Sequence, residues 1–107
     1  MCINIQMDKE TIKPEKKGYT IYTKSGCPNC VKVKNYLKSV NAPMIIIDCD
    51  DYLIENKEEF LKFIYELSGI TVKIFPIVFY EEKYIGGYSE TEKHYNMMSA
   101  FSNNDFF

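Results

Sequence analysis

The 107-residue chain contains no tryptophan and no arginine, and it has a single histidine, His94. All thirteen basic residues are therefore lysines, and fifteen acidic residues outnumber them, which gives a net charge of −2. Nucleic-acid grooves usually present a basic surface with arginine forks, so we expect no nucleic-acid partner. Nine tyrosines and seven phenylalanines supply the aromatic volume that one domain core needs without tryptophan.

Long apolar runs are also missing from the chain. The longest, Pro43 to Ile47, is far shorter than the roughly 20 residues that cross a bilayer, so we expect no membrane span. Residues 1–17 interrupt their few apolar side chains with charged ones, and no signal-peptide core forms. We therefore expect a cytoplasmic, reducing location. Because residues 1–17 also lack a sustained period, we treat them as an N-terminal extension and residues 18–107 as one domain.

The first half of this domain reads as strand, helix, strand. Tyr19–Thr23 is rich in β-branched and aromatic residues and precedes Ser25-Gly26, which is typical of a strand that ends in a turn. Pro28 suits the first turn of a helix, and apolar residues then recur at helical spacing. After a break, the apolar run Met44–Ile47 predicts a second strand that is covered on both faces. The helical connection makes it parallel to the first strand.

The second half of the domain adds two helices and a hairpin. Apolar residues on one face predict a helix over about residues 57–67. Residues 76–80 and 84–85, joined by a charged turn, predict a β-hairpin. A final helix is predicted over residues 89–101, after a pair of glycines. The element order predicts an α/β domain.

A Cys-Pro-Asn-Cys tetrad, Cys27 to Cys30, lies between the first strand and the first helix. A helix N-terminus presents unpaired N–H groups and positive potential, which stabilise the thiolate of Cys27, and Lys24 adds positive charge nearby. Cys30 follows one helical turn later, where it can close or reopen a disulfide with Cys27. We interpret the pair as a redox switch with Cys27 as its nucleophile.

Two structural interpretations of the tetrad are weaker. A zinc site usually needs a second ligand pair, and Cys2, Cys49 and His94 do not supply one by their spacing. A purely structural disulfide across four residues would constrain the unfolded chain very little. A redox role therefore accounts for the tetrad better than either alternative.

The other sulfur-containing residues and the histidine receive structural interpretations. Cys49 follows an apolar strand and reads as a small buried hydrophobe, whereas Cys2 is expected to be an exposed thiol without catalytic importance. Nothing places His94 beside the tetrad, so we assign it no catalytic role. Met97 and Met98 are expected to fill the core or its edge.

Three segments together resemble the signatures of the glutaredoxin family. Tyr22–Cys30, Phe75-Pro76 and Gly86–Glu90 occur in the family's order and at suitable separations, and the resemblance covers about residues 18–101. It implies a thioredoxin-like α/β fold in which a central, mixed, four-stranded sheet of order 2-1-3-4 has helices on both faces. The double glycine after the hairpin is the most particular of these marks.

The resemblance also implies a glutathione-dependent thiol–disulfide oxidoreductase. Cys27 and Cys30 would be its catalytic residues: the Cys27 thiolate attacks a disulfide, and Cys30 or glutathione resolves the intermediate. Glutathione would be cosubstrate and reductant, and the partners would be disulfide-containing or glutathionylated proteins. We expect a monomer without a bound metal.

The family's glutathione contacts can be carried over to this chain by position. Lysines would pair with a carboxylate, the main chain before a cis-proline would bind the tripeptide as an added strand, and the start of the last helix would hold the γ-glutamyl end. The positions implied are Lys24, Asn29, Lys73, Phe75, Pro76, Gly87, Tyr88, Ser89 and Glu90. The chain departs from the family at Asn29, where an aromatic residue is common, and at Tyr88, where many members have cysteine. Ile74-Phe75 likewise replaces the usual Thr-Val.

Two other functions remain open from the sequence. Two chains could hold an iron–sulfur cluster through their Cys27 thiolates and two glutathiones, as some glutaredoxins do. Alternatively, the protein could be a thioredoxin-like reductant that a reductase feeds directly, without glutathione.

Overall fold

The computed structural model describes residues 9–103 and contains a four-stranded sheet of order β2-β1-β3-β4. β2 (Met44–Asp48) runs parallel to β1 (Tyr19–Thr23). β3 (Ile77–Tyr80) runs antiparallel to β1, and β4 (Lys83–Gly86) runs antiparallel to β3. The mixed sheet and its strand order therefore confirm the expectation from the sequence.

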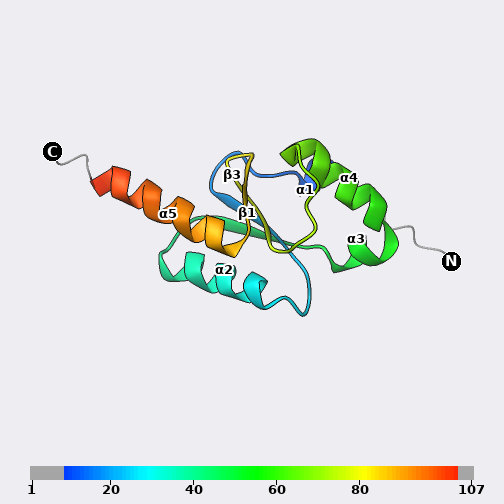
Figure 1. Cartoon of the computed structure of the whole chain (residues 1–107), viewed down its shortest axis with the longest axis horizontal. Coiled ribbons are helices and arrows are strands. Elements are labelled where there is room, and N and C mark those ends of the chain that lie inside the picture. Colours follow the sequence, from blue (N-terminus) through cyan, green and yellow to red (C-terminus); the bar gives the residue numbers. More distant parts are fainter. Residues whose placement is uncertain (1–8, 104–107) are drawn as a thin grey trace.

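Within the described residues, five helices cover the two faces of the sheet (Figure 1). The helical residues of one apolar cluster come from α1, α3 and α4, together with Cys30 at the start of α2, and those of the other come from α2 and α5. The helices are α1 (Lys9–Ile12), α2 (Pro28–Ser39), α3 (Asp50–Glu55), α4 (Lys57–Ser68) and α5 (Tyr88–Asn103). None of the helices within residues 9–103 is long and apolar enough to cross a membrane.

The central strand β1 joins the two halves of the core. All five of its residues are buried, and they alternate between the two faces because successive side chains of a strand point in opposite directions. Ile21 belongs to the cluster under α2 and α5, whereas Tyr22 belongs to the cluster under α4. The end of β1, where the tetrad begins, is thus held by packing on both sides.

The expectation that the second strand is covered on both faces is wrong. β2 is an edge strand, and Ile45 and Ile46 remain 46% and 45% exposed. A continuous apolar run does not reveal whether a strand lies at the centre of its sheet, covered on both faces, or at an edge where its side chains stay exposed. Met97 and Met98, expected to fill the core or its edge, are 56% and 41% exposed, and α5 extends past the sheet (Figure 1).

The hairpin was predicted correctly, but the two short helices α1 and α3 were not predicted. Glu81 and Glu82 both have positive φ angles, +49° and +74°, so the turn between β3 and β4 twists with its strands although it contains no glycine. The short helix α3 has no buried residue and therefore no apolar periodicity that could reveal it.

The residues before β1 contact the domain. Ile12 is 4% exposed within the core, and the Tyr22 hydroxyl donates a hydrogen bond to the Ile12 carbonyl oxygen. The Glu15 N–H donates to Thr20 Oγ1 over 2.9 Å. Residues 12–15 thus run against β1, whereas Cys2 lies outside the described residues.

Candidate active site

Cys27 is the N-cap residue of α2, with an extended backbone at φ −115° and ψ 101°. Pro28 begins the helix because its fixed φ suits this position and its missing N–H has no helical partner there. Cys27 Sγ accepts a hydrogen bond from the Cys30 N–H over 3.2 Å. The Cys27 sulfur therefore lies at the N-terminus of α2, bonded to a backbone N–H group of the first turn.

Cys30 lies beneath this sulfur in a different environment. Its side chain is 1% exposed, whereas Cys27 is partly exposed. Burial, followed by the hydrogen bond with Cys27, raises the pKa of the Cys30 thiol to about 12. Near neutral pH, Cys30 is a protonated, buried thiol. Cys27 is therefore the cysteine that can attack a disulfide substrate arriving from solution.

The loop that carries Cys27 is tied to the start of α3. The Ser25 N–H donates to Asp50 Oδ1 over 2.8 Å, and the Ser25 hydroxyl donates to the other carboxylate oxygen. These hydrogen bonds from Ser25 lower the pKa of Asp50, so the carboxylate stays charged. The Cys49 N–H also donates to the Thr23 carbonyl over 2.8 Å. Asp50 was not predicted as part of the site, because the sequence shows it only as one of several acidic residues after the apolar run, and its contact with Ser25 depends on the fold.

The segment before β3 forms the opposite side of the site. The Phe75–Pro76 peptide bond is cis, as the family resemblance implied. The Phe75 carbonyl oxygen lies 3.5 Å from Cys27 Sγ. The Phe75 ring is 8% exposed and stacks on Phe60, and Lys24 Nζ lies 5.7 Å from its centroid. The buried ring therefore anchors the main chain beside the reactive sulfur.

Three adjoining pockets surround this segment. A pocket of about 380 Å³ is lined by Lys24, Gly26, Cys27, Pro28, Asn29, Lys73, Ile74 and Phe75. On one side lies a pocket of about 550 Å³, lined by Lys24, Leu53, Lys57, Leu61, Lys73 and Phe75. A third pocket of about 500 Å³ is lined by Ile70, Thr71, Val72, Lys73, Ile74, Pro76, Tyr84, Ile85, Gly86, Gly87 and Glu90. The sulfur pocket shares lining residues with both of the others, so the three pockets adjoin, and together they are called the groove below.

The lysines of the groove include one that the sequence did not reveal. Lys24 and Lys73 line the sulfur pocket, as expected, and Lys57 joins them at the 550 Å³ pocket. Lys57 begins α4, so the sequence shows it only as a polar residue of a helix. The three ammonium groups make this end of the groove suitable for a carboxylate.

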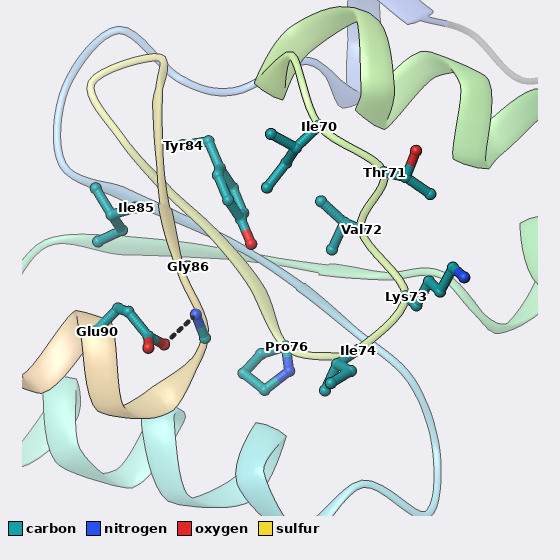
Figure 2. Close-up of a pocket in the computed structure, with 11 residues that line it drawn as sticks. Ile70, Thr71, Val72, Lys73, Ile74, Pro76, Tyr84, Ile85, Gly86 and Glu90 are labelled. Carbon is teal, nitrogen blue, oxygen red and sulfur yellow. Dashed lines mark hydrogen bonds between the residues drawn. The ribbon is translucent and has the colours of Figure 1, made fainter.

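The other end of the groove is formed where β4 meets α5. Gly86 has a φ of +126°, and a Cβ atom there would lie 2.6 Å from Glu90 Cγ. The Gly87 N–H donates to Glu90 Oε1 over 2.9 Å (Figure 2). Tyr88 and Ser89 do not line any of the three pockets, and Tyr88 packs against the core cluster under α2 and α5.

The other described cysteine, Cys49, and the histidine, His94, pack within the fold. Cys49 is 0% exposed, which confirms its interpretation as a buried hydrophobe, and burial raises its pKa to about 12. His94 Nδ1 forms a hydrogen bond of 2.8 Å with the Tyr19 hydroxyl, and burial lowers the histidine pKa. Its ring also packs on Tyr80, with centroids 4.6 Å apart. Among residues 9–103, no group of three or more His, Cys, Asp or Glu side chains could hold a metal ion.

Comparison with known proteins identifies the family. The family model Glutaredoxin matches residues 19–85. Glutaredoxin-2 of Schizosaccharomyces pombe is 31% identical over 74 residues, which are 69% of this chain and 64% of that protein. The chain thus matches less than two thirds of the length of this curated relative.

Solved structures show the same fold. Glutaredoxin 1 of Francisella tularensis has a TM-score of 0.66 at 24% identity, over 77% of this chain and 95% of that one. Wheat glutaredoxin has a TM-score of 0.61 at 28% identity, over 79% and 74%. A buckwheat glutaredoxin–glutathione complex has a TM-score of 0.55 at 23% identity, over 73% and 68%. With the family model spanning β1 to β4 and a cysteine pair at the start of α2, this chain belongs to the glutaredoxin family.

Proposed function

We propose that this protein is a glutathione-dependent thiol–disulfide oxidoreductase. Its substrates are protein disulfides and glutathionyl mixed disulfides. The observation that carries the proposal is the asymmetry of the cysteine pair: Cys27 Sγ is accessible and accepts the Cys30 N–H over 3.2 Å, while the Cys30 side chain is buried beneath it. One sulfur is thus set for attack and the other for resolution.

In the first step, the Cys27 thiolate attacks one sulfur of the substrate disulfide. A Cys27 mixed disulfide forms, the substrate S–S bond breaks, and the departing sulfur leaves as a thiolate that takes a proton from water. The Cys30 N–H stabilises the attacking anion before the step. The Phe75 carbonyl oxygen, 3.5 Å from the sulfur, lies where the incoming main chain can pair with this segment.

The second step depends on the substrate. For a glutathionyl substrate, Cys27 carries glutathione, and the thiolate of a second glutathione attacks it and releases glutathione disulfide. For a protein disulfide, the Cys30 thiol loses its proton and attacks Cys27 Sγ, which releases the reduced protein and leaves a Cys27–Cys30 disulfide. Two glutathiones then reduce that disulfide and become glutathione disulfide. The pKa of Cys30 is raised, so this thiol carries a proton before the step, and the proton passes to the sulfur that leaves Cys27, which departs as the thiol of the reduced protein.

The charges along the groove support glutathione as the reductant. Lys24, Lys57 and Lys73 can pair with the glycyl carboxylate at one end. At the other end, Glu90 uses one carboxylate oxygen for the Gly87 N–H and has lone pairs left for the γ-glutamyl ammonium group. The first N–H groups of α5 suit the γ-glutamyl carboxylate. The distribution of charge thus matches a zwitterionic tripeptide.

The test is the dependence of turnover on glutathione. A small glutathionyl mixed disulfide should be reduced when glutathione and glutathione reductase are supplied, and a thioredoxin-type reductase without glutathione should not replace them. Activity with that reductase alone would instead favour a thioredoxin-like reductant. The proposal includes a monomer in the cytoplasm, where the surroundings keep both thiols reduced between turnovers.

A further inference from the structure

The pocket that ends at Glu90 also has an apolar part, formed by Ile70, Val72 and Tyr84. Between α4 and β3, alternate residues of the chain turn to the same side: Ile70 and Val72 face Tyr84 across the pocket, whereas Thr71 and Lys73 point away from it (Figure 2). The pocket holds about 500 Å³. Its upper walls are thus made by aliphatic side chains and a tyrosine ring.

The isoleucines of this segment are exposed to an unusual degree. Ile74 is 75% exposed and Ile70 is 50% exposed, although Val72 between them is 8% exposed. Exposed apolar side chains beside a reactive sulfur favour ligand binding, because the free energy falls when a ligand removes their surface from water. The charges of glutathione match the two ends of the groove, but the tripeptide has no aliphatic side chain that could fill this part.

The pocket adjoins the site of covalent attachment. Lys73 and Ile74 line both this pocket and the pocket of Cys27. The carbonyl oxygen of Phe75, the residue after Ile74, lies 3.5 Å from Cys27 Sγ. Since consecutive Cα atoms are about 3.8 Å apart, a peptide joined to Cys27 through its own cysteine brings the adjacent residue to Ile74.

Resting on the function proposed above, we propose that this apolar pocket selects polypeptide disulfides with a large aliphatic residue next to the reactive cysteine. Ile70 and Ile74 are the specificity-determining residues. The substrate side chain lies against Ile74, Ile70 and Tyr84 while its cysteine forms the mixed disulfide with Cys27. Glutathione then uses the charged ends of the same groove after the reduced peptide has left.

The test compares two disulfide-bridged peptides that differ only by leucine or serine beside the cysteine. The wild-type protein should reduce the leucine peptide with a kcat/KM about tenfold higher, mostly through KM, since binding the side chain removes much of its apolar surface from water. Ile70→Ser should lower this ratio to about two, because it removes one wall of the pocket. Turnover of a small glutathionyl mixed disulfide by Ile70→Ser should fall by a smaller factor than reduction of the leucine peptide.

A matched control separates this effect from a general loss of surface hydrophobicity. Ile54 on α3 is 77% exposed and lines none of the three pockets, so Ile54→Ser should keep the wild-type ratio. Equal kcat/KM values for the two peptides in wild type, or an unchanged ratio in Ile70→Ser, would overturn the inference. Failure of the proposed function would look different, because turnover of the small glutathionyl substrate would then be lost in all of these proteins.

Discussion

At the scale of single residues, the buried thiols have a consequence for stability. Cys30 is 1% exposed and Cys49 is 0% exposed, and burial is the first cause that raises both pKa values to about 12. The ordinary value for the same group is 9.0. The folded protein therefore keeps two protons at a pH where the unfolded chain releases them.

We expect the reduced protein to lose stability as the pH rises from about 9 towards about 12, the range between the unfolded and folded pKa values of these thiols. Over this range the unfolded state binds fewer protons than the folded state, so the free energy of unfolding falls. Urea unfolding from neutral to strongly alkaline pH measures the decline. Cys49→Ala should show a shallower decline than wild type, whatever its stability at neutral pH, and equal slopes would contradict the prediction.

At the scale of secondary-structure elements, the junction of β4 and α5 sets the glutamate end of the groove. Gly86 adopts a φ of +126°, which side chains strongly disfavour, and its backbone lies close against Glu90. Gly87 does not have a positive φ, and a Cβ atom there would lie 3.5 Å from the Pro76 carbonyl oxygen, an ordinary contact. The two adjacent glycines therefore differ in what they tolerate.

Gly86→Ala should lower the free energy of unfolding by about 1–3 kcal/mol, because it combines a disfavoured backbone angle with a close contact. It should also raise the KM for glutathione, since Glu90 must move. Gly87→Ala should cost less stability, as it avoids both effects. Chemical denaturation and initial rates measure the two properties. A larger loss of stability in Gly87→Ala would show that the junction is described wrongly.

The helices and strands also differ in how well the sequence predicts their position and their exposure to solvent. α2 and α4 carry apolar residues at helical spacing, and both helices lie where this period predicts them. β2 was identified as a strand but given the wrong exposure, because Ile45 and Ile46 look the same in a central strand and at an edge. α3 was missed, since none of its six residues is fully buried and only Tyr52 and Leu53 pack partly buried against the core.

At the scale of the whole molecule, folding gathers positive charge that the composition conceals. The chain has a net charge of −2, yet Lys24, Lys57 and Lys73 line one pocket. Sequence reasoning assigned Lys24 and Lys73 to the site by family resemblance, but Lys57 comes from the start of a helix that only the fold brings to the groove. Glycine and cysteine motifs are local and can be read from the sequence, whereas a charge contributed by a distant element cannot.

Lys57→Gln should raise the KM for glutathione about two- to fivefold with little change in kcat, as expected for an exposed carboxylate partner. Added salt should reduce the difference between this variant and wild type. Lys62→Gln, on the same helix but not among the residues of the groove, provides the control. Equal KM values for wild type and Lys57→Gln at low salt would remove Lys57 from the glutathione site.

The most direct test of the account is the activity of the two cysteine variants on both kinds of substrate. Cys27→Ser should lose all exchange, because the accessible sulfur at the start of α2 makes the first attack in both reactions. Cys30→Ser should keep turnover of glutathionyl mixed disulfides, which glutathione can resolve, and should lose most reduction of protein disulfides, which a neighbouring thiol must resolve. Activity in Cys27→Ser, or equal loss of both reactions in folded Cys30→Ser, would contradict the assigned roles.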